Sequence, residues 1–298
     1  MGTPEIAKVC LARVVEQGFS VVAAYTKPDT PKNRGMKMTV SEVKAYCETA
    51  GIPVFQPTAF DDAACAQLEA LHPDLILVVA YGKILPQRVL DSAKYGCINM
   101  HASILPELRG AGPVQWSILR HFKETGVSAM YLSAGMDEGD VIEIRRTPID
   151  PEENSQQLLE RLTEIAAELS CDTIRAIEQG KAIRTPQDHS RATYAPMLSK
   201  ELSPTDFDQP AQYVADHIRG LYPWPAATAV VNGATLKLLS AKVLSEKTSQ
   251  PAGTFLSADK DGLRVACADG EVLLITGVQA EGGRQMAAAD YFRGHPLR

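Results

Sequence analysis

The sequence predicts an α/β protein, in which an open, mostly parallel sheet domain is followed by a small β-barrel domain. Three observations support this fold class. Short apolar runs alternate with helical segments as far as residue 178. Beyond residue 226, short β runs are separated by turn signals. The length of 298 residues corresponds to roughly two average domains.

The first domain is expected to begin with a helix. Thr3 is its expected N-cap, Pro4 its first helical residue, and Gly18 ends it. Strands are then expected at 21–25, 53–55, 75–80, 97–100, 127–132 and 141–149. They alternate with helices expected at 40–50, 63–71, 114–122 and 155–178. This order implies right-handed crossovers in a Rossmann-like sheet, with ligands beyond the carboxyl ends of the strands.

The chain is expected to divide into a catalytic domain at 1–183, a linker at 184–204 and a C-terminal domain at 205–298. The linker is rich in Thr, Pro, Gln, Ser and Asp and lacks periodicity. The last domain should open with a helix at 211–219. Its strands are expected at 227–231, 236–243, 253–256, 263–266 and 272–278, with hairpin turns at Asn232-Gly233 and Asp269-Gly270. An OB-like barrel is one option for such short strands.

Composition excludes several classes of protein. With 45% hydrophobic and 22% charged residues the chain is a folded soluble protein, and its net charge of -6 provides no overall attraction for nucleic acid. No apolar run reaches membrane-spanning length and no signal peptide is apparent, so we expect a cytoplasmic protein. The six cysteines form no C-x-x-C pair, which favours reduced, buried thiols over a zinc site or disulfides.

The strand at 97–100 runs into the most informative segment. Asn99 and His101 alternate with apolar Ile98 and Met100, so both polar side chains lie on one face where the strand leaves the sheet. An amide donor beside an imidazole suits acyl transfer, because the amide holds an oxygen that gains charge while the imidazole handles protons. The alternative is a strand-end histidine that merely bonds to a loop.

A second candidate is the acidic turn Gly135-Met136-Asp137-Glu138-Gly139-Asp140. A carboxylate from this turn would orient or charge the ring of His101, as the third group does in catalytic triads. The alternative is an ordinary turn, because Asp and Gly are common turn residues.

These segments resemble the formyltransferase family that uses 10-formyltetrahydrofolate. The similarity is carried by Asn99-Met100-His101-Ala102-Ser103-Ile104-Leu105-Pro106, Arg109-Gly110-Ala111-Gly112-Pro113 and the acidic turn. It implies that Asn99, His101 and Asp137 are catalytic. It also implies that Ser103, Ile104, Leu105 and Pro106, together with Tyr81 and Gly82, bind the folate, although Lys83 replaces the leucine typical of the family.

The resemblance implies a reaction without metal or enzyme nucleophile. The formyl group moves from 10-formyltetrahydrofolate to the α-amino group of methionine esterified to initiator tRNA, which gives formylmethionyl-tRNA for translation initiation. The protein is then expected to act as a monomer with initiator methionyl-tRNA and folate as partners. Two alternatives remain: transfer to a UDP-amino sugar, and a non-catalytic RNA-binding protein.

A basic segment favours the RNA substrate. Residues 27–44 hold five basic side chains against two acidic ones. Lys27, Lys32, Arg34 and Lys37 are the candidates for tRNA phosphates, whereas a solvated surface loop is the alternative. The family's tRNA enzymes carry a similar loop here. Trp224, which lies between two prolines, either packs between domains or stacks on a base.

The sequence departs from the family at its start. Relatives have a short apolar strand before Gly-Thr-Pro-Glu, whereas this sequence starts at Met1-Gly2-Thr3-Pro4. We therefore expect the first sheet strand to be missing, which costs several kcal/mol if each buried apolar side chain contributes ~1.5 to 3 kcal/mol. The accompanying hypothesis is that the sequence begins at an internal methionine.

Overall fold

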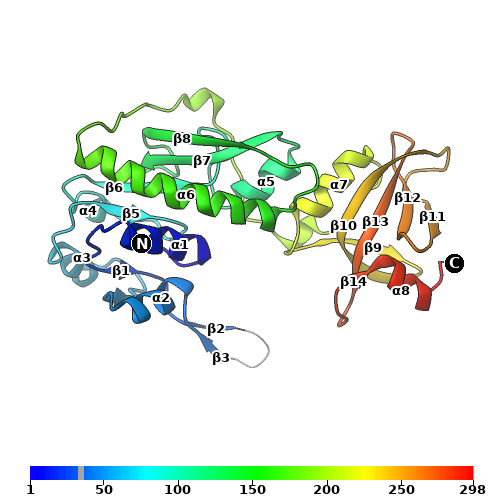
Figure 1. Cartoon of the computed structure of the whole chain (residues 1–298), viewed down its shortest axis with the longest axis horizontal. Helices are drawn as coiled ribbons and strands as arrows, with labels where there is room; N and C mark the ends of the chain where they lie inside the picture. Colours follow the sequence, from blue (N-terminus) through cyan, green and yellow to red (C-terminus); the bar gives the residue numbers. More distant parts are fainter. Residues whose placement is uncertain (33–36, 298) are drawn as a thin grey trace. The chain divides into compact units, whose positions relative to one another are not determined.

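A computed structural model describes residues 1–32 and 37–297 (Figure 1). The chain forms two compact units. Unit 1 comprises Met1–Pro113, Thr125–Thr147 and Glu160–Ala195, and unit 2 comprises Val114–Glu124, Pro148–Leu159 and Pro196–Arg298.

Unit 1 is an α/β unit, as predicted. Its helices are α1 (Glu5–Glu16), α2 (Glu42–Ala50), α3 (Asp62–Glu69), α4 (Gln87–Leu90) and most of α6 (Ser155–Glu178). Its strands are β1 (Ala24–Tyr25), β2 (Thr30–Lys32), β3 (Lys37–Thr39), β4 (Val54–Phe55), β5 (Ile76–Val78), β6 (Cys97–His101), β7 (Glu124–Tyr131) and β8 (Val141–Pro148). Leu162, Ala166 and Leu169 of α6 are fully buried, and the helix runs alongside β7 and β8 in Figure 1.

The predicted fold class is confirmed, with one difference in strand direction. β1 pairs with β4 in parallel, and the order of the larger sheet is β5-β6-β7-β8. β5 and β6 are parallel, but β7 is antiparallel to β6, with Asn99 opposite Met130 and His101 opposite Ser128. The alternation of elements along the sequence determines their type, whereas strand direction depends on how each connection folds.

The start of α1 was predicted one residue too early. The helix begins at Glu5, so Pro4 occupies the N-cap position instead of Thr3 and makes no side-chain cap hydrogen bond. Other elements differ from the prediction in their bounds, and several were not predicted at all. The β2–β3 hairpin, α4, β14 and α8 were not predicted, and residues 37–39 form a strand ahead of α2. These elements are short, so each gives only a weak periodic signal.

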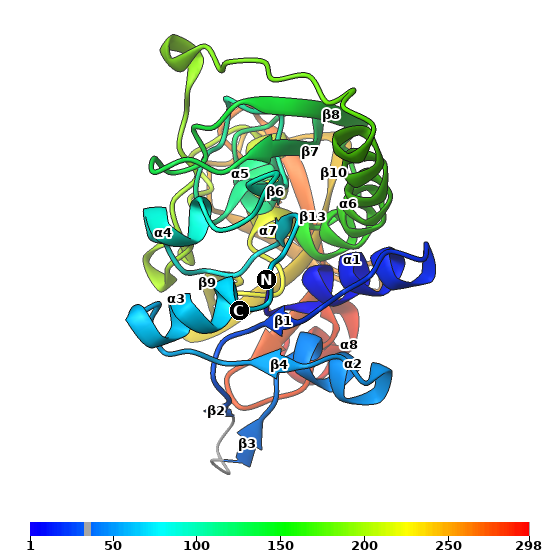
Figure 2. The same cartoon turned by 90° about the vertical axis from the view of Figure 1, so that its left-hand side faces the viewer.

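A slot separates β1 from β5. Met1 and Gly2 lie at one end of it: the Gly2 N–H donates to Tyr25 O (2.9 Å), the Val79 N–H donates to Met1 O (2.9 Å), and the terminal amine donates to Leu77 O (2.6 Å). Figure 1 places the N-terminus between these two strands, and Figure 2 shows it close to β1. The rest of the slot is a cavity of about 540 Å³, lined largely by apolar side chains such as Leu11 and Val14.

The slot explains why β1 and β5 are shorter than predicted. Val21, Val22, Ala23 and Leu75 were expected to be strand residues, but they border the cavity and lie outside β1 and β5. A strand edge that faces an empty slot has no ladder to extend it. The position of the slot is where a doubly wound sheet requires a central strand.

Unit 2 contains one curled antiparallel sheet. Its strands are β9 (Ala227–Val231), β10 (Ala234–Lys247), β11 (Phe255–Ala258), β12 (Leu263–Ala266), β13 (Glu271–Ala280) and β14 (Met286–Ala287), in the order β11-β12-β13-β10-β9 with β14 paired to β13. The helices are α5 (Pro113–Leu119), α7 (Ala211–Gly220) and α8 (Ala288–Gly294). Asn232 and Gly233 both have positive φ, which is the two-residue hairpin turn predicted between β9 and β10.

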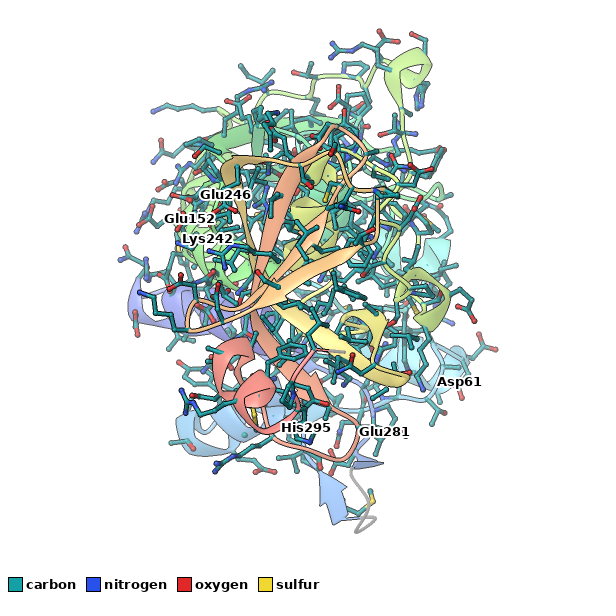
Figure 3. All side chains as sticks on the ribbon, turned by 90° about the vertical axis from the view of Figure 1, so that its right-hand side faces the viewer. Asp61, Glu152, Lys242, Glu246, Glu281 and His295 are labelled. Carbon is teal, nitrogen blue, oxygen red and sulfur yellow. The ribbon has the colours of Figure 1, made fainter. Side chains whose placement is uncertain are left out.

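The core of unit 2 lies between α7 and this sheet. Ile218, Leu236, Leu238 and Ile275 are fully buried there. On the outer surface, Lys242 of β10 forms an ion pair with Glu152 (3.3 Å), and Figure 3 shows the two side chains next to each other.

Two predictions from composition can be compared with the described residues. All six cysteines are buried and free, and burial raises the pKa values of the Cys10, Cys97 and Cys267 thiols to about 12. Among residues 1–32 and 37–297, no helix combines the length and the apolar character needed to cross a bilayer.

Candidate active site

β6 places Asn99 and His101 on one face of the sheet at the carboxyl end of the strand. All five residues of β6 are buried, and Val78 of β5 is paired with Asn99. The side-chain amide of Asn99 makes no hydrogen bond within the described part of the chain. The residue is 9% exposed, and its amide is not among the fully buried side-chain groups without a partner in the described residues, so the amide lies at an accessible surface. Asn99 therefore has a free donor and acceptor for a substrate.

His101 and Asp137 are brought together, although 36 positions separate them in the sequence. The His101 Nδ1 lies 3.6 Å from Asp137 Oδ2, within ion-pair range but beyond a normal hydrogen bond. On the other side of the ring, Nε2 lies 2.9 Å from Leu108 O. A carbonyl oxygen only accepts, so Nε2 carries a proton and Nδ1 is the nitrogen that exchanges one.

Asp137 lies in the acidic turn between β7 and β8, and a backbone N–H from the loop after β6 holds its carboxylate. The Gly110 N–H donates to Asp137 Oδ2 (2.8 Å). Gly110 has φ +107°, and a Cβ at this position would lie 2.8 Å from Ala195 O. Only glycine can adopt this conformation in the space available, so the Arg-Gly-Ala motif presents its N–H to the carboxylate.

The segment 103–106 is held by a serine on β7. Ser128 Oγ donates to Ser103 O (2.7 Å) and accepts the Leu105 N–H (3.1 Å). Ser103 Oγ donates to Glu107 O (2.6 Å), and Leu105 packs with Met130 in a small buried cluster. Ile104 and Pro106 are partly exposed. The loop is therefore fixed by its backbone and presents two apolar side chains to a ligand.

Tyr81 and Gly82 follow β5 at the same sheet edge. The Tyr81 ring is 1% exposed and packs against Phe60, and burial raises the pKa of its hydroxyl to about 12. A ligand near this loop would therefore meet the backbone of Tyr81. Gly82 has φ +66°, and the Lys27 ammonium lies beside it. Lys83 donates to the carbonyl oxygens of Pro57 and Thr58.

The basic segment extends from the carboxyl end of β1. Lys27 is exposed, whereas Lys44 is paired with Asp29 (2.6 Å). The backbones of Lys32 and Lys37 are opposite each other in the β2–β3 hairpin. Arg34 lies outside the described residues. In unit 2, Trp224 is 52% exposed.

Three residues at the site gave no signal in the sequence: Ser128, Gln187 and Thr193. Gln187 and Thr193 come from the segment expected to be a linker, but they belong to unit 1. Thr193 Oγ1 accepts the Leu108 N–H (2.9 Å), Thr193 O accepts the Arg109 N–H (2.9 Å), and the Ala195 N–H donates to Arg109 O (2.7 Å). Isolated polar residues in a segment without periodicity leave no pattern from which such hydrogen bonds can be predicted.

The donor set of the site is one amide, one imidazole and one carboxylate, together with backbone N–H groups. In residues 1–32 and 37–297, no three His, Cys, Asp or Glu side chains are grouped so that they could hold a metal ion. These groups can donate hydrogen bonds to a carbonyl oxygen and can transfer a proton.

Comparison with protein families matches both parts of the chain. The formyl transferase family model matches residues 2–174, and the model described as formyl transferase, C-terminal domain, matches residues 197–296. A curated methionyl-tRNA formyltransferase of Clostridioides difficile is 38% identical over 298 residues, which cover 100% of this chain and 96% of that protein. The corresponding protein of Geobacter sulfurreducens is 41% identical, with 100% and 93% covered.

Solved structures share the fold at lower identity. An N-formyltransferase from Helicobacter canadensis, in complex with folinic acid and dTDP-3-aminofucose, aligns with a TM-score of 0.72 at 16% identity, covering 92% of this chain and 96% of that one. A methionyl-tRNA formyltransferase from Clostridium thermocellum aligns with a TM-score of 0.51 at 22% identity, covering 68% and 88%. At these identities the likeness concerns the fold alone.

Proposed function

The chain belongs to the methionyl-tRNA formyltransferase family, and from this premise we propose that it transfers a formyl group from 10-formyltetrahydrofolate to the α-amino group of methionyl-initiator tRNA. The observation that carries the proposal is the meeting of Asn99, His101 and Asp137 at the carboxyl end of β6, where Asp137 Oδ2 lies 3.6 Å from His101 Nδ1. Full-length relatives with this activity in their names support the choice of acceptor.

The roles of the three side chains follow from their chemistry. The amine attacks the formyl carbon, the carbonyl oxygen gains negative charge, and the bond from the formyl carbon to N10 of the folate then breaks. The Asn99 amide donates a hydrogen bond to that oxygen. His101 Nδ1 exchanges the proton that passes from the amine towards N10 of the folate, and Asp137 accepts a hydrogen bond from Nδ1 when this nitrogen is protonated. The 3.6 Å separation shortens once substrate fills the site.

The donor is proposed to lie along residues 103–106 and beside the backbone of Tyr81 and Gly82. Two features fit a flat, partly polar ring. The loop is fixed by Ser128, and Ile104 and Pro106 are partly exposed. In this proposal Lys27, Lys32, Arg34 and Lys37 contact phosphates of the acceptor, and the protein acts as a cytoplasmic monomer.

The test compares acceptors. The chain is incubated with 10-formyltetrahydrofolate and with methionyl-initiator tRNA, uncharged initiator tRNA or a UDP-amino sugar, and formyl transfer is followed. We expect transfer only to the charged tRNA. Transfer to the sugar nucleotide would replace the proposed acceptor, and the absence of transfer to all three would leave RNA binding as the function to be measured.

A further inference from the structure

The backbone of Asp137 is strained in a way that bears on the site. Asp137 has φ +54°, in the left-handed region that is unfavourable for a residue with a Cβ, although aspartate tolerates it better than most. Such a conformation persists only where the surroundings fix it. The direction of the Asp137 side chain depends on this backbone angle, so whatever fixes the angle also aims the carboxylate at His101.

Gln187 supplies the hydrogen bonds that fix it. Its amide nitrogen donates to Asp137 O (2.9 Å) and to Gly139 O (2.7 Å), so it bridges the turn that carries the carboxylate. Its amide oxygen accepts from Arg109 Nη2 (2.8 Å) and Arg109 Nε (3.2 Å). Gln187 is 8% exposed, and both polar atoms of its side chain are used within the protein.

Arg109 closes the network. Its guanidinium is 1% exposed and also contacts Glu138 (3.4 Å) in the acidic turn, while the next N–H along the chain, from Gly110, is the donor to Asp137 Oδ2. The Arg-Gly segment therefore reaches Asp137 by two routes. One runs through Gln187 to the backbone of Asp137, and the other runs directly to its carboxylate.

We propose that Gln187 is a positioning residue for formyl transfer, which holds the Asp137 backbone in its left-handed conformation and thereby sets the carboxylate against His101. Gln187 does not touch the reacting atoms in this role. The proposal rests on the proposed function, because it concerns the same site.

The test uses two substitutions of similar volume. Gln187→Glu keeps the acceptor for Arg109 but lacks the two donors to the turn, and Gln187→Met lacks both. We expect kcat for formyl transfer to fall about 10²-fold in each, as for a misplacement of about 1 Å, with a smaller change in the KM for the formyl donor. Gln87→Met, at an exposed glutamine of α4, is the matched control and should leave kcat unchanged.

A second measurement separates positioning from general stability. In an Asp137→Asn background, Gln187→Met should cost little further rate, because the group that it positions is already disabled. In the NMR spectrum, Gln187→Met should move the ¹⁵N signals of the His101 ring in the same direction as Asp137→Asn does. A full and additive loss in the Asp137→Asn background, or unchanged His101 ring signals, would overturn the proposal.

These readouts distinguish the two proposals from each other. If the wild-type chain transfers no formyl group to methionyl-tRNA, the proposed function fails, yet the ¹⁵N signals of the His101 ring still test the role of Gln187. If a Gln187 variant fails to bind the formyl donor or unfolds at a lower denaturant concentration than Gln87→Met, the comparison is made with Gln187→Glu, which retains the hydrogen bonds from Arg109. Wild-type kcat in a folded Gln187→Glu variant would contradict positioning.

Discussion

At the scale of single residues, the site is assembled from an amide, an imidazole and a carboxylate whose surroundings differ. Asn99 has an unpaired amide within the described chain, His101 has one nitrogen fixed by Leu108 O, and Asp137 is anchored by Gly110 N–H. The imidazole and the carboxylate are therefore each fixed by a contact within the protein, whereas the Asn99 amide is not. Substitutions at these residues are therefore expected to have different effects on turnover and on stability.

The first prediction concerns the two β6 residues. Asn99→Ala and His101→Ala should each lower turnover by ~10²- to 10³-fold, because one donor to a developing oxyanion is typically worth that much. Binding of the folate should be retained, since its proposed binding residues are 103–106. Steady-state kinetics and a folate binding titration check both statements, with His295→Ala after α8 as the control. Unchanged turnover in either β6 variant would remove that residue from the mechanism.

The second prediction concerns Ser128, whose fully buried hydroxyl serves two backbone groups of the donor loop. Ser128→Ala leaves the Leu105 N–H and the Ser103 carbonyl without this partner, which should lower the free energy of unfolding by about 1–3 kcal/mol. The KM for the formyl donor should rise more than kcat falls. Denaturant titration and steady-state kinetics provide the measurements. Ser117→Ala, at an equally buried serine that bonds only within its own helix, should cost less.

At the scale of elements, the helices and strands with a periodic pattern could be predicted from the sequence. The contacts that they make with distant segments could not. The helix at 155–178 and the strands at 227–231 and 263–266 have the predicted bounds, because each is long, strongly periodic or flanked by a turn signal. Asn99 and His101 could be proposed from alternation alone. That Asp137 lies near His101 could be predicted only from the resemblance to a family. The roles of Gln187 and Ser128 could not be predicted from the sequence, because hydrogen bonds between distant segments leave no local pattern.

The slot between β1 and β5 gives the third prediction. Burial lowers the pKa of the Met1 ammonium from 8.0 to about 6. The unfolded 298-residue chain therefore binds more protons between pH 6 and pH 8, and the free energy of unfolding should rise with pH across this window by up to ~3 kcal/mol. Burial also lowers the pKa of His217, so the measurement compares the chain with its N-acetylated form. Acetylation should remove the part of this pH dependence that comes from the Met1 amine. Equal slopes of the free energy of unfolding against pH for the two forms would contradict this.

The same slot predicts the effect of added chain. A continuous apolar segment of about five residues placed ahead of Met1 should fill the cavity as a parallel strand and raise the denaturation midpoint, because each buried apolar side chain contributes ~1.5 to 3 kcal/mol. The control is an extension of equal length made of Gly and Ser. If both extensions give the same midpoint, the cavity does not accept a strand.

At the scale of the whole molecule, an acidic protein has to bind a polyanion. The net charge of -6 means that any attraction to tRNA depends on local arrangement, for which the basic segment after β1 is the candidate. Replacing Lys27, Lys32, Arg34 and Lys37 by Gln should raise the KM for methionyl-tRNA and leave the KM for the formyl donor unchanged. The slope of log KM against log salt should fall by about 0.7 to 0.9 for each phosphate that is no longer neutralised. Lys94→Gln, at an exposed lysine ahead of β6, should change neither value.

Asn99, His101 and Asp137 are proposed to act together on a formyl group, with Asp137 acting through His101. The decisive measurement is single-turnover formyl transfer to methionyl-tRNA by His101→Asn, Asp137→Asn and the double variant. If Asp137 acts through His101, the double variant should be about as slow as His101→Asn alone, because residues that work together lose rate non-additively. Losses that multiply in the double variant, or a wild-type rate in Asp137→Asn, would contradict the account.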